Sequence, residues 1–203
     1  MTNDAPDPHR DRILDTAAEQ VRRFGEAKTN VVDIAKAMGL SHSAIYRHFR
    51  SKADIFDALA ARTMAEEAEL AARFVTADGP AAERLRGLVL ALHRSKRTKL
   101  GDDPEIHGLY RRILSERPDL VADYARRMTG LVRQVLEDGR TRGEFRVADL
   151  DVAAGVVRDA VTVFVHPARV EQAVLAGLDL EPRLEAMIDT LITAFAADGL
   201  PQR

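Results

Sequence analysis

The side chains with the greatest potential for chemistry gather in one short segment, residues 30–52. It holds a tyrosine, two of the six histidines and four cations: Lys36, Arg47, Arg50 and Lys52. No acidic residue lies between Asp33 and Asp54, although the whole chain carries a net charge of -2. A local basic segment on a slightly acidic protein is typical of a small DNA-binding module carried by a different kind of domain.

The rest of the sequence offers no motif for catalysis or for a metal. Cysteine is absent, and there is no Walker loop, glycine-rich dinucleotide turn or His-Glu-x-x-His motif. His93, His107 and His166 form no i,i+4 pair of ligands. We therefore expect neither an enzyme nor a bound metal or cofactor.

Composition and periodicity favour an all-α protein. Of the 203 residues, 46% are hydrophobic and 31% charged, and alanine, leucine, arginine and glutamate dominate. Apolar residues recur with a helical period almost throughout. The first eight residues are polar, and no apolar run is long enough to span a bilayer, so we expect a cytoplasmic protein without a membrane partner.

The helix signals divide the chain into two domains, residues 9–55 and residues 56–203. Three short helices come first: one ended by Gly25, one capped by Asn30, and one capped by Ser41 that runs to about Phe49. Ser51 then caps a long fourth helix. The later helices are expected at about 52–77, 81–97, 107–114, 118–141, 152–165 and 168–178, with a last helix from Pro182 to Asp198-Gly199.

The second and third helices read as a helix-turn-helix. Gly39 supplies the left-handed backbone of a tight turn, and Ala35 is small where two helices cross closely. Small and polar side chains then open the third helix, where they can reach base edges in the major groove.

This segment resembles the TetR family of bacterial repressors. The family pattern stands here as Ile34-Ala35, Gly39-Leu40-Ser41, Tyr46-Arg47-His48-Phe49 and Ser51-Lys52. The match covers roughly residues 13–59, and the remainder agrees in length and helical layout. The sequence departs from the pattern at Asn30, where threonine is common, and at Ser43, where glycine is frequent.

The resemblance implies that Tyr46, His48 and Lys52 contact phosphates and that the start of the third helix, His42 in particular, contacts bases. Tyr46 as a packed aromatic and Lys52 as an ordinary solvated lysine are the alternatives. The full set expected to contact double-stranded operator DNA is Asn30, Lys36, Ser41, His42, Ser43, Ala44, Tyr46, Arg47, His48 and Lys52.

The last helices are expected to form a homodimer. The resemblance implies a four-helix bundle between subunits, and apolar stripes support it. The residues assigned to this interface are Val156, Leu184, Met187, Ile188, Leu191, Ile192 and Phe195.

A small-molecule effector is expected in the second domain, which is larger than dimerisation requires. Its candidate contacts are His93, His107, Tyr110, Tyr124, Met128, Arg158, Thr162 and Phe164. Arg158 interrupts an apolar helix, so it either clamps a carboxylate, pairs with Asp159 or lies at the subunit interface. The basic run from His93 to Lys99 is typical of a solvated helix end.

The sequence thus predicts a dimeric transcriptional regulator, a repressor released from a palindromic operator by a small ligand. The alternative is a DNA-binding protein of the same fold that is regulated by a protein partner. Activation in place of repression stays open, because the DNA-binding residues would be the same.

Overall fold

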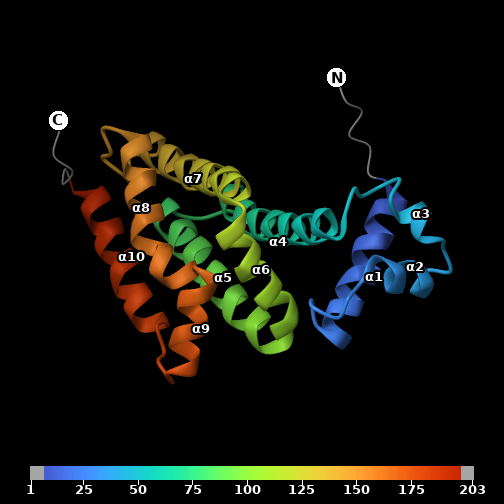
Figure 1. The fold of residues 1–203 in the computed structure, drawn as a ribbon. Helices are drawn as coiled ribbons and strands as arrows, with labels where there is room; N and C mark the ends of the chain where they lie inside the picture. The colour runs from blue at the N-terminus through green and yellow to red at the C-terminus, as the bar shows by residue number, and fades with distance from the viewer. Residues whose placement is uncertain (1–6, 198–203) are drawn as a thin grey trace. The chain divides into compact units, whose positions relative to one another are not determined.

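A computed structural model describes residues 7–197 of the chain, which form ten helices and no strand (Figure 1). The all-α class expected from the sequence is therefore confirmed. The first helices are α1 Pro8–Phe24, α2 Val31–Ala37, α3 His42–Ile45, α4 Lys52–Val75 and α5 Ala81–Asp102. They are followed by α6 Pro104–Glu116, α7 Pro118–Thr141, α8 Leu150–Val165, α9 Pro167–Leu175 and α10 Glu181–Ala196. The expected end of the last helix at Asp198-Gly199 lies outside the described residues.

The chain divides into two compact units. The first comprises the chain up to Thr63 together with Asp102–Arg117, and the second comprises Met64–Gly101 and the chain from Pro118 onward. The first unit therefore holds α1, α2, α3, the beginning of α4, and also α6, which belongs by sequence to the region assigned to the second domain.

The first unit is built on α1, which is capped at both ends. Asp7 accepts a hydrogen bond from the backbone N–H of His9 at 3.0 Å, Pro8 opens the helix, and Gly25 ends it with φ 77°. One face of α1 is buried, including Ile13 and Val21. α6 packs on α1 and is held by ion pairs from Arg112 to Glu26 and from Arg117 to Asp57. The core of the unit also includes Ile34, Ile45, Phe49, Ile55 and Phe56.

Two helix ends differ most from the sequence-based expectation; among the smaller differences, α6 begins at Pro104 instead of 107 and α9 ends at Leu175 instead of 178. α3 ends at Ile45 instead of Phe49, because the backbone tightens into a turn in which the His48 N–H donates to the Ile45 carbonyl at 2.9 Å. α5 continues through Gly101 to Asp102 instead of ending near Arg97. The break comes just before Pro104, since a proline disfavours helical geometry in the residue that precedes it.

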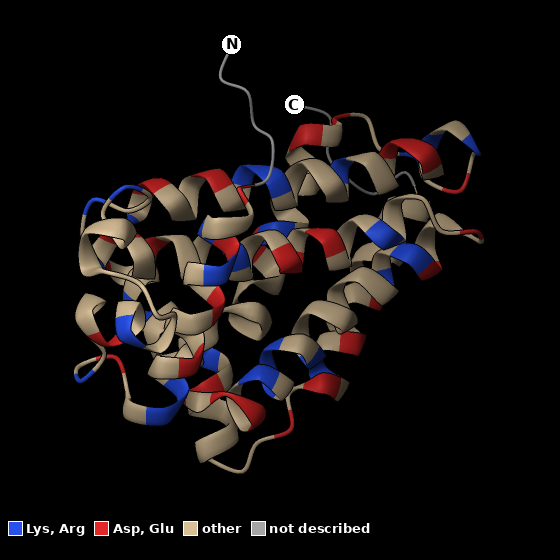
Figure 2. Cartoon of the chain, turned by 90° about the vertical axis from the view of Figure 1, so that its right-hand side faces the viewer, with Lys and Arg blue, Asp and Glu red and all other residues tan. Residues whose placement is uncertain are grey.

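The second unit has one continuous core, in which α7 and α8 pack closely and α10 covers α8 (Figure 1). Gly139 on α7 lets Phe145 and Ala81, the first residue of α5, approach α7 closely, since a Cβ there would overlap the ring of Phe145 and lie 2.7 Å from the Cβ of Ala81. Asp149 caps α8 by accepting hydrogen bonds from the N–H groups of Asp151 and Val152. Positive and negative side chains are interspersed along the helices (Figure 2).

None of the helices within residues 7–197 combines the length and the apolar character needed to cross a membrane.

Candidate nucleic-acid interface and effector region

The turn between α2 and α3 has the geometry that the sequence predicts. Gly39 has φ 68°, its N–H donates to the Lys36 carbonyl at 3.1 Å, and the Leu40 N–H reaches back to the Ala35 carbonyl at 2.9 Å. These two bonds form a Schellman motif, which ends α2 and redirects the chain within two residues. Ala35 and Ile45 are buried on either side of the turn, so α3 is fixed against α2 by packing.

The side chains at the start of α3 are presented to solvent. Ser41, His42 and Ser43 are exposed, and Tyr46 is 48% exposed, so it is not the packed aromatic of the alternative interpretation. The rings of His42 and Tyr46 meet edge to face with centroids 6.1 Å apart, as expected for residues four apart on a helix. Arg47 is exposed beside them. This surface offers donors and acceptors without an acidic side chain.

Three of the expected DNA contacts have other roles in the structure. Ala44 is only 9% exposed, so its methyl group is not available to a base edge. Asn30 and Ser41 occupy N-cap positions without making a side-chain capping bond. The Asn30 amide donates instead to the Lys28 carbonyl at 3.4 Å, and the Ser41 hydroxyl pairs with that of Ser43 at 2.9 Å.

Lys52 at the start of α4 is already engaged. Its Nζ donates to the Glu26 carbonyl at 3.0 Å and lies 5.2 Å from the ring centroid of Phe56. Lys52 is therefore neither a freely solvated lysine nor an open phosphate ligand. The helix start itself is well formed, because the Asp54 N–H donates to the Ser51 hydroxyl and the Arg50 N–H to the Asp54 carboxylate.

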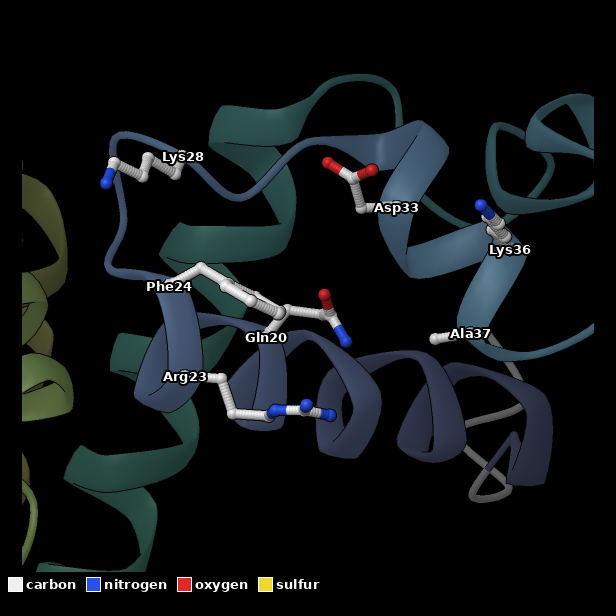
Figure 3. Close-up of a pocket in the computed structure, with 7 residues that line it drawn as sticks. All are labelled: Gln20, Arg23, Phe24, Lys28, Asp33, Lys36 and Ala37. Atoms are coloured by element: carbon white, nitrogen blue, oxygen red, sulfur yellow. The ribbon is translucent and has the colours of Figure 1, made fainter.

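Lys36 lies on the exposed face of α2. It lines a groove of about 500 Å³ between the second half of α1 and α2 (Figure 3). The groove is lined by Gln20, Arg23, Phe24, Lys28, Asp33, Lys36 and Ala37. Asp33 lies one turn before Lys36, so its carboxylate weakens the positive field of the lysine on this face.

His48 is half-buried and is held by the first turn of α1. Its Nδ1 lies 2.8 Å from Oδ2 of Asp7, and its carbonyl accepts a hydrogen bond from Arg10 at 3.0 Å. Phe49, which follows, is buried with the Arg10 guanidinium 4.1 Å from its ring centroid. Asp7 and Arg10 were not identified from the sequence, because they lie about forty residues before His48.

In the second unit, a cluster of buried polar side chains joins α4, α5 and α7. Lys96 Nζ contacts both carboxylate oxygens of Glu67 at 2.6 Å, and the Tyr124 hydroxyl donates to Glu67 at 2.9 Å. Lys96 and Glu67 are 3% and 1% exposed. Burial lowers the pKa of Lys96, which the Glu67 carboxylate partly offsets, and burial together with Glu67 raises the pKa of Tyr124 well above its ordinary value.

His93 lies one turn before Lys96 on α5 and is 1% exposed. Its Nδ1 is 2.7 Å from the Phe164 carbonyl, which can only accept, so Nδ1 carries the proton and Nε2 is an acceptor in the neutral ring. Nε2 has no hydrogen-bond partner among the described residues. Nearby, burial and then the charges of Lys96 and Arg169 lower the pKa of His166. A neutral His166 therefore borders the cluster near pH 7.

The expected effector contacts are divided between the two units. His107 and Tyr110 are buried on α6 of the first unit, whereas Tyr124, Met128 and Phe164 are largely buried in the second. Thr162 is exposed and donates to the Arg158 carbonyl. Arg158 is exposed as well, and its Nε donates to Asp159 at 2.8 Å, which is the pairing alternative raised by the sequence.

Sequence reasoning missed Glu67 and Lys96. The interpretation of residues 93–99 as a solvated helix end is wrong at Lys96, which is buried. The sequence does contain a signal for the burial of Lys96, because it follows Leu85, Leu88 and Leu92 at helical spacing on the apolar stripe of α5. Within residues 7–197 no group of three or more histidine or acidic side chains is arranged to hold a metal ion.

Apolar side chains remain exposed on α8 and half-buried on α10. Val152 and Val163 on α8 are 57% and 48% exposed, and Val156 between them is half-buried. On α10, Met187, Leu191 and Ile192 are half-buried. Leu184, Ile188 and Phe195, also assigned to the dimer interface, are buried within the chain's own core and are not available to a second subunit.

Curated relatives match only part of the chain. A nucleoid occlusion factor SlmA from Aliivibrio fischeri is 43% identical over 51 residues, 25% of this chain and 26% of the relative. The regulator AcrR from Shigella flexneri is 43% identical over 47 residues, 23% of this chain and 22% of the relative. The chain thus spans about a quarter of the length of the curated relatives it matches.

Solved structures match over nearly the whole chain. SmeT, the repressor of the Stenotrophomonas maltophilia multidrug efflux pump SmeDEF, is 20% identical with a TM-score of 0.64, over 98% of this chain and 96% of SmeT. The fatty acid degradation regulator FadR from Bacillus halodurans is 21% identical with a TM-score of 0.64, over 98% and 100%. At these identities the likeness shows a shared fold.

Family models cover both parts of the chain. Residues 13–59 match the model described as bacterial regulatory proteins of the tetR family, and residues 81–191 match that of a tetracyclin repressor-like C-terminal domain. The second match alone covers more than half of the 203 residues. This chain belongs to the TetR family of bacterial transcriptional regulators.

Proposed function

We propose that this protein is a repressor that binds a palindromic operator as a homodimer and is released from DNA by a small molecule. The observation that carries the proposal is the exposed start of α3, set at a fixed angle by the Schellman turn. His42, Tyr46 and Arg47 stand free on this surface and offer hydrogen-bond donors to bases and phosphates.

The dimer part of the proposal rests on the exposed and half-buried apolar side chains of α8 and α10. Val152 and Val156 lie four residues apart and Val163 seven residues further on, so they share one face of α8, on which the exposed Asp159 also lies. With Met187 and Leu191 on the neighbouring α10 they form an apolar patch of the kind that marks protein interfaces. A two-fold dimer would place two recognition helices about 34–36 Å apart, one helical turn of DNA.

The direct test is selection of bound sequences from random DNA with the full-length protein. We expect a two-fold symmetric motif. A selection that returns no symmetric motif contradicts binding as a dimer to a palindrome.

Two variants separate base contacts from phosphate contacts. His42→Ala should relax base preference at one position in each half-site, because it removes a side chain from the start of α3. Lys52→Ala should weaken binding to all sequences and lower the salt slope by about 1 if Lys52 leaves Glu26 to neutralise a phosphate. Uniform loss of affinity in both variants would show that His42 does not read a base.

The effector part of the proposal rests on His93. A buried ring nitrogen that accepts but has no partner among the described residues suits a ligand hydroxyl or N–H group. Apart from the cluster of Lys96, Glu67 and Tyr124, the core of this unit is apolar, which favours a largely apolar molecule with one such donor. Arg158 points to no acidic ligand, because it is exposed and paired with Asp159. Among proteins of this fold, SmeT has been solved with triclosan and a FadR from Bacillus subtilis with stearoyl-CoA.

The effector test uses the selected operator. Phenols and alcohols, each paired with its methyl ether, are titrated against the protein–operator complex by fluorescence anisotropy. We expect the hydroxyl compounds to release DNA better than the ethers, and His93→Leu to remove this preference. Arg158→Ala is the control and should respond as the unmodified protein does. Equal release by ethers would exclude His93 from the site.

The alternative regulation, by a protein partner, makes a different prediction. The protein would then form a DNA-dependent complex with that partner and respond to no small molecule.

A further inference from the structure

The residue before α1 makes two different hydrogen bonds with its carboxylate. Oδ1 of Asp7 accepts from the His9 N–H at 3.0 Å and caps the helix, while Oδ2 lies 2.8 Å from Nδ1 of His48. A simple helix cap needs only the first bond. The second reaches 41 residues along the chain, to a histidine of the recognition motif.

We propose that Asp7 is a positioning residue for DNA binding, which holds Nδ1 of His48 so that Nε2 of the same ring donates to a DNA phosphate. The inference rests on the proposed function, since it assumes that the surface around α3 binds DNA.

The protonation of the ring follows from its two partners. A carboxylate and a phosphate are both acceptors, so a ring that bonds to Asp7 through Nδ1 and to DNA through Nε2 must carry both protons. The bound His48 is therefore an imidazolium between two anions, and each of its bonds is charge-assisted. Binding DNA then consumes a proton wherever the free ring is neutral.

The surroundings of His48 explain why a carboxylate is needed. The His9 ring lies 6.0 Å from the His48 ring, Arg10 bonds to the His48 carbonyl, and Arg47 lines the same hollow of about 240 Å³. These basic groups oppose a positive charge on His48, and the Asp7 carboxylate offsets them. Burial acts to raise the pKa of Asp7, but the hydrogen bonds from His9 and His48 lower it below its ordinary value, so Asp7 is ionised at neutral pH.

Capping and positioning can be separated by substitution. Asp7→Asn keeps a good N-cap residue, because asparagine caps helices about as well as aspartate, but it removes the negative charge beside His48. Asp11→Asn is the matched control: Asp11 lies in the first turn of the same helix and is exposed, and its loss changes the net charge by the same amount.

General electrostatics and the proposal predict opposite results. Removing an acidic charge near DNA strengthens binding if only the long-range field matters. If Asp7 positions His48, Asp7→Asn instead weakens binding despite the favourable change in net charge.

The experiment measures affinity of the full chain for the selected operator by fluorescence anisotropy, at about pH 6 and about pH 8, either side of the ordinary histidine pKa of about 6.5. We expect Asp7→Asn to bind about tenfold more weakly at the higher pH, the size of one lost charge-assisted hydrogen bond. The loss should shrink at the lower pH, where an ordinary imidazole is largely protonated. Asp11→Asn should bind at least as tightly as the unmodified protein at both pH values.

A double variant completes the test. Asp7→Asn combined with His48→Gln should lose no more affinity than His48→Gln alone, because Asp7 acts through that ring. The proposal is overturned if Asp7→Asn binds as tightly as the unmodified protein at the higher pH, or if its loss is the same at both. Absence of operator binding by the unmodified protein would instead overturn the proposed function.

Discussion

Replacing Lys96 by methionine breaks the buried ion pair of the second unit and should destabilise the fold strongly. Lys96 and Glu67 are 3% and 1% exposed, so the variant leaves a buried carboxylate that still accepts a hydrogen bond from the Tyr124 hydroxyl. Removing one partner of such a pair costs about 3–5 kcal/mol. For a chain of this size each kcal/mol lowers Tm by about 2–4 °C, so the expected fall in Tm is about 6–20 °C.

The adjacent exposed pair is the matched control. Lys99 and Glu66 lie on the same two helices with Nζ and Oε2 3.1 Å apart, but their side chains are 33% and 57% exposed; Lys99 Nζ also lies at the longer distance of 4.0 Å from Glu67. Lys99→Met should therefore change the free energy of unfolding by less than about 1 kcal/mol. Both variants are measured by thermal melting and urea unfolding at equal protein concentration.

A triple variant, Glu67→Leu, Lys96→Met and Tyr124→Phe, separates two quantities. One is the net contribution of the ion pair to the free energy of unfolding, and the other is the cost of leaving one partner buried alone. Replacing all three polar groups by apolar ones should restore most of the stability that Lys96→Met loses. The reasoning is refuted if Lys96→Met is no more destabilising than Lys99→Met, since water would then be screening the inner pair.

Three further changes test other parts of the fold. Burial and Glu67 raise the pKa of Tyr124, so the folded chain keeps the phenol proton at a pH where the unfolded chain loses it. The free energy of unfolding, measured in urea, should therefore fall as pH rises above about 10. Tyr124→Phe should not show this fall. Gly139→Ala places a methyl group against Phe145 and should lose about 1–3 kcal/mol on urea unfolding, whereas Gly130→Ala in the same helix meets nothing within 4 Å and should gain about 1 kcal/mol. Equal effects would mean that α7 shifts freely. Leu191→Glu puts a charge into the proposed subunit interface and should give a monomer by sedimentation that does not bind operator; a dimer with normal affinity would place the interface elsewhere.

Features set by a single residue type were predictable from the sequence. Gly25 and Gly39 end their helices with positive φ, and Ser51 caps α4, because these residue types have few alternatives at helix ends. Asn30 shows where such rules stop. It occupies the N-cap position, but its amide donates to a carbonyl in the preceding loop, and sequence alone does not decide between these local hydrogen bonds.

Contacts between distant segments were not predictable. The bond between Asp7 and His48 depends on how α1 packs beside α3, and the burial of Lys96 depends on Glu67 from another helix. A lone lysine on an apolar stripe is a conflict that only tertiary structure resolves, by supplying the opposite charge. The position of Lys96 on the apolar stripe of α5 can be read from the sequence alone, but its partner Glu67 cannot.

The inclusion of α6 in the first unit limits how this protein can be cut or recombined. A fragment that stops at Thr63 contains the complete helix-turn-helix but lacks α6, with its buried Leu109 and Ile113. It also leaves Glu26 and Asp57 without the arginines of α6 that pair with them. The DNA-reading module is thus encoded in two separate stretches of the gene. A chimera that exchanges operator specificity between relatives should therefore transfer both stretches, since a single crossover after α3 leaves one protein's α6 against another protein's α1.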